Sequence, residues 1–209
     1  FDPGRGALFD HALDALTANG VQVIGFIHPL HAWREEALFR SGRSDTYFEL
    51  RESLTDVFDR HAAASPDNAC IEGGGAVLWD FSGFRDFASL PAPGPDQVAA
   101  HPNFYEPSHY LPHIGQAMLD TLRGDAIPAD GVSGDRLEPG NLADSAVAIR
   151  ARRQRWLETA DGQAATALFD ALEASGPVAE TETPQFLNRD DRRSLEDKIS
   201  RIAPGRAGR

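Results

Sequence analysis

A helix, a glycine and a buried strand follow one another near the start of the chain, and this unit constrains the fold more than any other part of the sequence. Residues 7–18 place apolar side chains at helical spacing, and Asn19-Gly20 is typical of a helix C-terminus. Residues 21–27 form a short, mostly apolar run rich in β-branched residues, the pattern of a strand buried on both faces. This succession is the repeating unit of α/β folds, so we expect an α/β protein with a parallel sheet.

The alternation continues to about residue 124. Helical spacing predicts helices over 32–40, 44–64 and 111–122, and a second apolar run predicts a strand over 76–81. Residues 89–103 are rich in proline and predict a long loop, of a length that usually carries function. We therefore divide the chain as follows: an α/β domain over 1–124, a linker over 125–140, a helical extension over 141–175 and a polar, partly disordered tail over 176–209.

Composition excludes several classes of function. The 209 residues carry a formal net charge of −12, so a broad basic face for nucleic acid is not expected. No apolar run approaches the ~20 residues of a membrane-spanning helix. The single cysteine, Cys70, excludes an internal disulfide and a cysteine-rich zinc site. Gly73-Gly74-Gly75 precedes a strand, whereas a phosphate-binding loop follows one, so we predict no nucleotide or other cofactor.

Polar residues lie where each predicted strand ends and where the helix at 111 begins. In open parallel sheets, ligands bind outside the carboxyl ends of the strands. One edge of one sheet is therefore expected to gather these groups, and their convergence is more informative than any single residue. The groups are His28 with His31, Asp80 with Ser82, and Glu106 with His109.

Of the three groups, Glu106 and His109 point most directly to a chemical role. A carboxylate three residues before a histidine is able to hold the imidazole through Nδ1, which leaves Nε2 free to take a proton from a nucleophile. The alternative is a solvated loop histidine and a carboxylate that is favoured by the dipole of the following helix.

The other two groups each have a chemical and a structural interpretation. His28 and His31 line a pocket or bind a metal; alternatively, one caps the following helix and the other is exposed, which fits His31 better than His28. Ser82 is a candidate nucleophile, but Asp80 and Phe84 occupy the glycine positions of a G-x-S-x-G elbow. The structural alternative, in which Asp80 and Ser82 bond to the turn backbone, is favoured.

Metal binding is the weaker interpretation of the histidines. His109 and His113 are four residues apart, but Leu111-Pro112 lies between them and no H-E-x-x-H motif is present. We predict no metal site.

The segment from Phe104 to Leu119, with the block Tyr105-Glu-Pro-Ser-His-Tyr110, resembles the last signature block of SGNH (GDSL-like) hydrolases. The strand that ends in Ile27-His28-Pro29 and the stretch Leu78-Trp-Asp-Phe-Ser-Gly83 are similar to bacterial SGNH-like cell-envelope proteins, distant relatives of D-alanine-transfer and alginate O-acetyltransferase proteins. The resemblance covers about residues 7–123.

This resemblance implies a flavodoxin-like three-layer α/β/α fold in which His109 is the general base and Glu106 its orienting acid. The family usually has Asp in place of Glu106. The Gly-Asp-Ser nucleophile block and the Gly-x-Asn-Asp block of the family are both absent, and in the family both precede a strand like 21–27. The chain also starts at Phe1 without a targeting signal. We therefore expect the C-terminal part of such a domain, without its first strand.

The resemblance implies an acyl hydrolase or O-acyltransferase that acts on ester or acylated envelope-glycan substrates, with the serine supplied by upstream sequence. We assign substrate binding to five residues: His28, His31, Asp80, Ser82 and Tyr105. An extracytoplasmic location in the bacterial envelope and an envelope protein partner follow from the resemblance alone. Two alternatives stay open: an SGNH-like binding or assembly domain without catalysis, and a metal-dependent hydrolase that uses three histidines and an aspartate, namely His28, His31, His109 and Asp80.

Overall fold

The computed structural model describes residues 3–63, 69–72, 74–92, 101–124 and 131–175. The chain forms two compact units, residues 1–169 and 170–209. All the elements below lie in the first unit, except that the last helix continues across the boundary. The predictions for 176–209, a polar tail with partial disorder, fall outside the described residues.

The sheet of the first unit has three strands in the order β1-β2-β5. β1 (Val23–Ile27) pairs in parallel with β2 (Ala76–Asp80), and β5 (Asp135–Leu137) pairs antiparallel with β2. The two predicted strands and their parallel pairing are thus confirmed, and β2 is buried as expected. The prediction that the first strand is buried on both faces is wrong, because β1 is half-buried and its Phe26 is 45% exposed. β5 lies inside the segment 125–140, for which the sequence predicts a linker, so part of that segment belongs to the sheet. The described part of the chain is mixed α/β, with more helix than strand.

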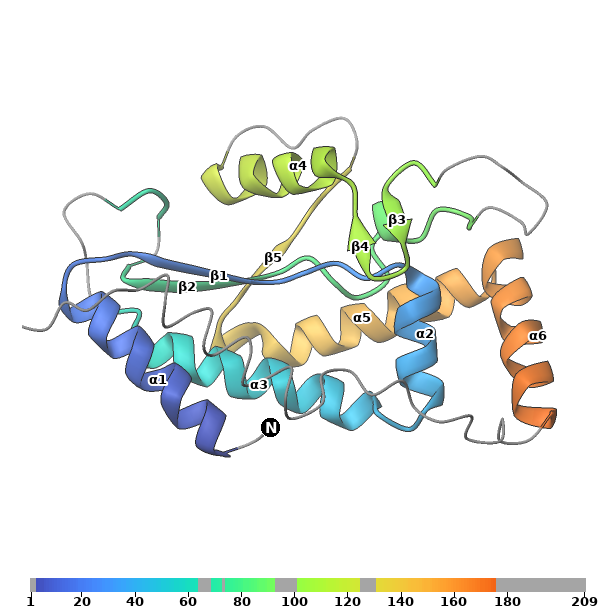
Figure 1. The fold of residues 1–209 in the computed structure, drawn as a ribbon, viewed down its shortest axis with the longest axis horizontal. Coiled ribbons are helices and arrows are strands. Elements are labelled where there is room, and N and C mark those ends of the chain that lie inside the picture. Colours follow the sequence, from blue (N-terminus) through green and yellow to red (C-terminus); the bar gives the residue numbers. More distant parts are fainter. Residues whose placement is uncertain (1–2, 64–68, 73, 93–100, 125–130, 176–209) are drawn as a thin grey trace, which may run out of the picture. The chain divides into compact units, whose positions relative to one another are not determined.

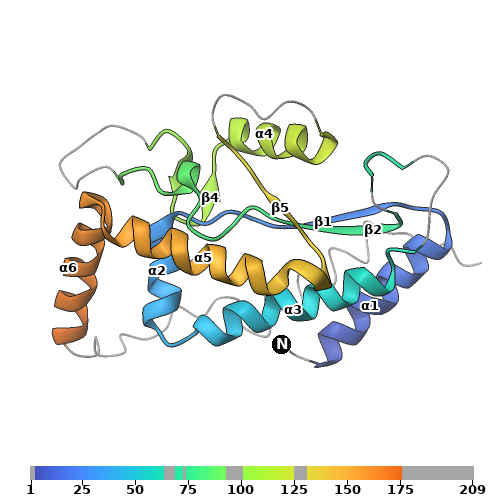
Figure 2. The ribbon, with the colours of Figure 1, turned by 180° about the vertical axis from the view of Figure 1, so that it is seen from behind.

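Helices cover both faces of this sheet (Figures 1 and 2). α4 (Pro112–Arg123) packs on one face, and α1 (Pro3–Ala18) and α3 (Ser44–Arg60) pack on the other. Successive strand residues alternate between the two faces, so β1 and β2 each contribute to both cores. The core on the α4 side contains Phe81, Phe87, Phe104, Ile114, Ala117, Met118 and Leu122. The core on the α1 and α3 side contains Leu13, Val57, Phe58, Ala76, Leu78 and Leu137.

The remaining helices build a third core at the carboxyl end of β2. They are α2 (Ala32–Arg40), α5 (Leu142–Leu157) and α6 (Ala160–Ala174). Two short 3-10 helices lie at Asp86–Ala88, which packs in the core on the α4 side, and at Pro139–Asn141. The third core contains buried residues from α2, α5, the first part of α6 and the turn after β2: Ala32, Phe84, Ile149, Trp156 and Ala165. The predicted helical extension up to residue 169 therefore packs within the same unit as the sheet.

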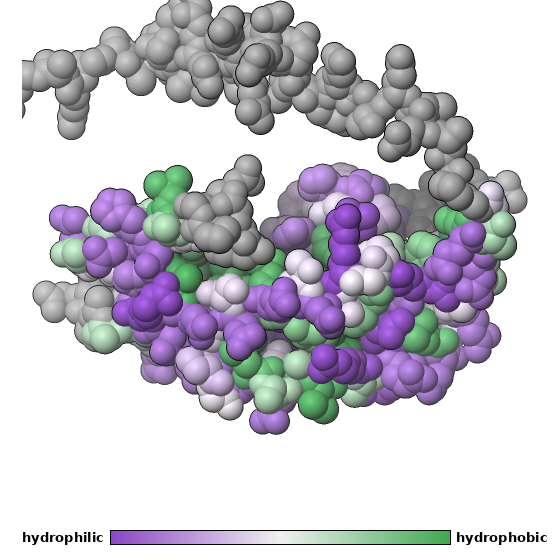
Figure 3. All heavy atoms as spheres, turned by 90° about the horizontal axis from the view of Figure 1, so that it is seen from below, coloured by the Kyte–Doolittle hydropathy of each residue, from purple (hydrophilic) through white to green (hydrophobic). Residues whose placement is uncertain are grey.

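Opposite α4, the outer surface of the first unit is mainly hydrophilic, with separate hydrophobic patches (Figure 3). Leu50 on α3 and Leu16 on α1 are among the exposed apolar side chains. None of the helices in the described part of the chain combines the length and apolar character that a membrane crossing requires.

A two-stranded hairpin that the sequence did not predict precedes α4. Its strands are β3 (Phe104–Glu106) and β4 (His109–Tyr110), with Glu106 paired to His109 across the turn. α4 then begins with Pro112, whose missing N–H is not needed in the first helical turn, and ends at Gly124, which has a left-handed φ of 74°. The hairpin therefore holds a candidate pair of residues directly before a helix that is fixed in the core.

Candidate functional site

The hairpin β3–β4 brings Glu106 and His109 into direct contact. The Glu106 carboxylate Oε1 is hydrogen-bonded to Nδ1 of His109, and the other oxygen, Oε2, accepts the backbone N–H of Ser108 at 2.9 Å. The contact that the spacing predicted is confirmed. These interactions hold the pKa of Glu106 below its ordinary value, first through the Ser108 N–H and then through His109, with a smaller effect of Arg34.

The pair faces outward. The side chain of His109 is 79% exposed and that of Glu106 is 48% exposed. With Nδ1 taken by the carboxylate, Nε2 of His109 is available for a substrate or another protein group. Within the described residues, no hydroxyl or thiol is hydrogen-bonded to this nitrogen. The pair therefore has the geometry that an acid–histidine–nucleophile arrangement requires of its acid and its histidine.

The segment after β1 anchors the hairpin and adds a second histidine to this surface. The backbone N–H of His31 donates to the Pro107 carbonyl in the hairpin turn at 3.0 Å. His28 follows β1 and lies near His109. The pKa of His28 is below its ordinary value, because neighbouring atoms exclude water from the ring and because His109 adds positive charge. Tyr105, on β3, is 69% exposed. His28, Tyr105, Glu106 and His109 thus belong to one exposed region.

Asp80 and Ser82 instead form a buried cluster with a residue that the sequence did not single out, Arg51 of α3. Asp80 is 0% exposed and Ser82 is 2% exposed. Asp80 Oδ2 accepts Arg51 Nε at 2.9 Å, and Asp80 Oδ1 accepts the Ser82 backbone N–H at 2.8 Å. The Ser82 hydroxyl contacts both the Asp80 carboxylate and Arg51 Nη2. The structural interpretation is confirmed for Asp80, which bonds to the turn backbone at Ser82, whereas the Ser82 hydroxyl bonds to side chains and not to the backbone.

A second buried carboxylate, Glu35 of α2, holds the turn that follows this cluster. Its two oxygens accept the backbone N–H groups of Gly83 and Phe84, both at 2.7 Å. Gly83 and Phe84 have φ angles of 90° and 56°, so two consecutive residues are left-handed and point their N–H groups at the same carboxylate. Burial raises the pKa of Glu35 to about 7, although the two N–H donors and Arg51 act in the opposite direction.

His31 is a structural residue. It is 2% exposed, its Nδ1 accepts the Trp33 backbone N–H at 3.2 Å, and its Nε2 contacts the Leu90 carbonyl at 2.9 Å. It therefore caps α2, whereas His28 is exposed, in agreement with the alternative interpretation of these two histidines. The prediction that His31 binds substrate has no support in this geometry, because neither ring nitrogen is free.

The residues named in the metal hypothesis do not converge. Asp80 is bound to Arg51, and His31 is bound to Leu90 and Trp33, while His28 and His109 lie at the surface. Among the described residues, no group of three or more histidine, cysteine, aspartate or glutamate side chains is arranged to hold a metal ion.

The sequence did contain a signal for the buried charges. Glu35 stands three residues after Ala32 and four before Phe39, on the inward stripe of α2. Arg51 stands four residues before Thr55 and seven before Phe58, on the inward stripe of α3. A charge in such a position requires a buried partner, and a search for that partner would have led to the polar residues at the end of the second strand.

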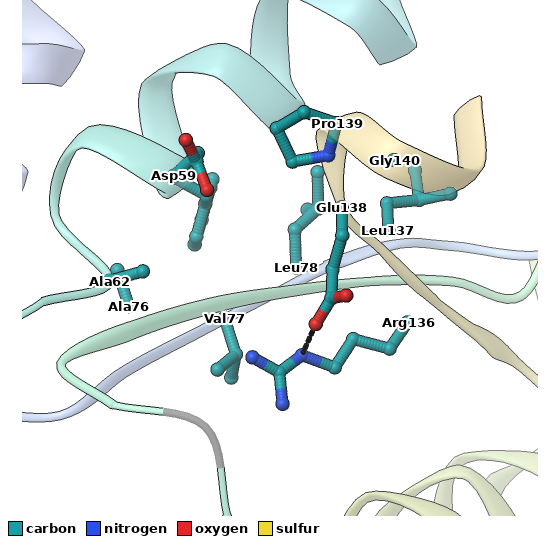
Figure 4. Close-up of a pocket in the computed structure, with 11 residues that line it drawn as sticks. Asp59, Ala62, Ala76, Val77, Leu78, Arg136, Leu137, Glu138, Pro139 and Gly140 are labelled. Carbon is teal, nitrogen blue, oxygen red and sulfur yellow. Dashed lines mark ion pairs between the residues drawn. The ribbon is translucent and has the colours of Figure 1, made fainter.

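Among the hollows of the first unit, a pocket and a groove lie against the sheet. A pocket of about 200 Å³ lies between the end of α3, the first residues of β2 and the segment 136–140, with the Arg136–Glu138 ion pair at its rim (Figure 4). It is at the start of β2, the end opposite Asp80. An apolar groove of about 360 Å³ begins at Tyr110, next to His109, and continues along α4 past Leu119 to Phe26. The lining of the groove thus includes the residue that follows His109 in the chain, whereas the pocket is lined by other segments.

Comparison of the chain with protein-family models, with curated proteins and with solved structures finds no match. The function is therefore inferred from the residues themselves.

Proposed function

We propose that this chain is part of an SGNH-like acyl hydrolase or O-acyltransferase, with His109 as general base and Glu106 as the residue that orients it. The observation that supports the proposal most directly is the contact of the Glu106 carboxylate with Nδ1 of His109, which leaves Nε2 exposed. The flavodoxin-like three-layer fold belongs to the same proposal. The parallel β1–β2 pair with helices on both faces supports it.

In this proposal the reaction proceeds through a covalent acyl-enzyme. Nε2 of His109 takes the proton of a serine hydroxyl, and the serine oxygen attacks the carbonyl carbon of the ester. The resulting tetrahedral intermediate expels the alcohol, which receives the proton from Nε2. Water or a sugar hydroxyl then attacks the acyl-serine with His109 again as base, and the serine is regenerated. Glu106 stabilises the imidazolium that forms in each step.

The serine of this mechanism comes from outside the described residues. Ser82 is excluded as the nucleophile by its burial and by its contacts with Asp80 and Arg51. We assign substrate contact to His28 and Tyr105, which share the exposed region with His109. The apolar groove that begins at Tyr110 is suited to the acyl group of the substrate, since its lining is mostly hydrocarbon.

The substrate class in this proposal is an acyl ester or an acylated envelope glycan, and the location is the outer side of the bacterial cytoplasmic membrane, with an envelope protein as partner. These points rest on the resemblance of the block 105–110 to envelope members of the family. Fold and motif do not select between hydrolysis and transfer to a sugar, so both acceptors are included in the test.

The test is labelling with a fluorophosphonate probe, followed by peptide mapping, on the protein expressed from its complete reading frame. We expect one serine to be labelled. We also expect His109→Ala to reduce turnover of p-nitrophenyl acetate, with water or an added sugar as acceptor, by about 10²–10⁴-fold, the range for loss of a general base. His113→Ala is the matched control, because His113 is an exposed histidine at the start of α4. Turnover that survives in His109→Ala at the wild-type level contradicts the proposal.

A second candidate function is a binding or assembly domain without catalysis. It is favoured by one observation: within the described residues, Nε2 of His109 has no nucleophile beside it. If the complete protein is not labelled by the probe and has no esterase activity above the His109→Ala background, this second function replaces the first.

A further inference from the structure

Two buried histidines from distant parts of the chain meet at one backbone carbonyl. His31 and His101 are 2% and 8% exposed, and their ring centroids lie 4.9 Å apart in an edge-to-face arrangement. Nε2 of His31 lies 2.9 Å from the Leu90 carbonyl oxygen, and Nε2 of His101 lies 3.3 Å from the same oxygen. Neither histidine takes part in the proposed chemistry.

The other nitrogen of each ring fixes its protonation state. Nδ1 of His31 accepts the Trp33 N–H at 3.2 Å, and Nδ1 of His101 accepts the N–H groups of Asn103 and Phe104 at 3.0 and 3.1 Å. An Nδ1 that accepts an N–H carries no proton, so both rings are neutral with the proton on Nε2, directed at Leu90. A protonated ring would point an N–H at an N–H, and each of these contacts would be lost.

These contacts join three segments, one of which carries the Glu106–His109 pair. His31 caps α2, and its backbone N–H holds the hairpin turn at Pro107. His101 holds the start of β3, where the Asn103 side chain also donates to the Phe87 carbonyl at 2.7 Å. Phe104 packs edge-on against both rings, with centroid distances of 5.6 and 5.5 Å. Protonation of a ring therefore removes the cap of α2 or the turn at the start of β3, and weakens the support of the hairpin on that side.

We propose that His31 and His101 form an acid-sensitive latch that positions the β3–β4 hairpin: the latch is closed while both rings are neutral and opens when either is protonated. The latch deepens the proposed function and rests on it in one respect, because it would control where His109 stands, but its test does not depend on catalysis.

Few charged groups near the latch oppose or favour its protonation. Asp161 of α6 favours the charged form of His31, but its carboxylate already accepts Trp33 Nε1 at 2.8 Å and the Ala92 N–H at 3.2 Å. On α2, the Glu35 carboxylate is turned away to the Gly83–Phe84 backbone. Burial lowers the pKa of His31 below its ordinary value, and the charge of the neighbouring histidine lowers it further, while the Leu90 carbonyl and Asp161 act in the opposite direction.

Amide hydrogen exchange between pH 7.5 and pH 5, corrected for intrinsic rates, tests the latch on the complete protein. Opening exposes histidines that bind a proton with an ordinary pKa, so protection of residues 31–36 and 101–111 is expected to fall by up to about tenfold per pH unit below about 6.5 for each histidine. Protection that does not change with pH in these segments overturns the proposal.

The double variant His31→Asn/His101→Asn separates titration from packing. Asparagine keeps an acceptor for the cap at 31 and for the turn at 101, but it does not titrate. We expect the pH dependence of exchange in 31–36 and 101–111 to disappear in this variant and to persist in His11→Asn, an exposed histidine on α1. The same pH dependence in the double variant and the wild type contradicts the latch.

Nitrogen NMR of the wild-type histidines gives an independent result that no folding defect affects. At pH 7.5, two histidines should show the Nε2–H tautomer and hydrogen exchange slower than that of the others. If the rings of His31 and His101 carry the proton on Nδ1, the latch is wrong. Loss of esterase activity in His109→Ala bears on the proposed function alone, so the two proposals fail separately.

Discussion

The exposed Glu106–His109 pair and the buried cluster around Asp80 contain similar chemical groups in opposite states. Both place a carboxylate from the last residue of a strand against a nitrogen-bearing side chain. In the exposed pair, His109 keeps one nitrogen free and 79% of its side chain accessible. In the buried cluster, the side chains of Asp80, Ser82 and Arg51 are hydrogen-bonded to one another, and none of the three residues is more than 3% exposed.

This difference shows that catalytic residue types lying close together are a weak indication of an active site. A hydrogen-bonding atom that has no protein partner, such as Nε2 of His109, is a stronger one. A buried charge without a partner costs several kcal/mol, so buried carboxylates such as Asp80 are paired and thereby lose their capacity to bind a substrate. An exposed pair contributes little to stability and is free to do chemistry. The three predictions that follow challenge this contrast, beginning with the largest expected effect.

Arg51→Met tests whether the buried cluster is structural. The substitution leaves the Asp80 carboxylate 0% exposed and without its cation, and loss of one member of a buried pair costs about 3–5 kcal/mol of unfolding free energy. Urea denaturation measures the change. Arg60→Met, at an exposed arginine of the same helix, is the matched control and should leave the midpoint near the wild-type value. A loss for Arg51→Met no larger than that of the control would show that the cluster does not carry stability.

Glu35 predicts a pH dependence of stability whose sign is opposite to that of an ordinary paired carboxylate. Its folded-state pKa of about 7 lies above the ordinary value of 4.5, so the folded protein binds the proton more tightly than the unfolded chain. Its contribution is complete below pH 4.5 and is lost as the pH rises to 7, a change of about 3 kcal/mol. The difference in unfolding free energy between wild type and Glu35→Gln, measured from pH 4.5 to 8, should follow this curve. A difference that is constant over the range contradicts it.

Glu106→Gln should have the smallest effect on stability and a large effect on the proposed activity. Because the pair is exposed, the urea midpoint is expected to stay within experimental error of the wild type. Glutamine no longer stabilises the imidazolium, so esterase turnover of the complete protein should fall. A clear shift of the urea midpoint would show that Glu106 stabilises the fold, as Asp80 and Glu35 do, and would contradict the contrast between the exposed pair and the buried cluster.

The sequence predicted the elements whose patterns are local. Periodicity located β1, β2 and the helices from α1 to α4 within a few residues, and it indicated helix over the span of α5 and α6. Spacing predicted the Glu106–His109 contact, because a single turn bridges so short a separation. It missed β3, β4 and β5, which are two or three residues long and therefore too short for a period to appear.

Long-range pairings were not predictable in the same way. The partners Arg51–Asp80, Glu35–Gly83 and His31–His101 lie far apart in the sequence, and each pairing depends on how the strands and helices are placed in space. The inward stripes of α2 and α3 indicated only that Glu35 and Arg51 needed partners. The identity of those partners required the fold.

The position of β2 between β1 and β5 has a consequence for the order in which the chain acquires its fold. β2 pairs with β1, as in Val23–Ala76, and with β5, as in Leu78–Leu137, and in both cases a long stretch of chain separates the partners. Both pairings are high in contact order, so the central strand closes two long loops before its hydrogen bonds are complete. During synthesis, Leu137 must leave the ribosome before the sheet has its third strand. Until then, the edge of β2 that pairs with β5 has no strand partner.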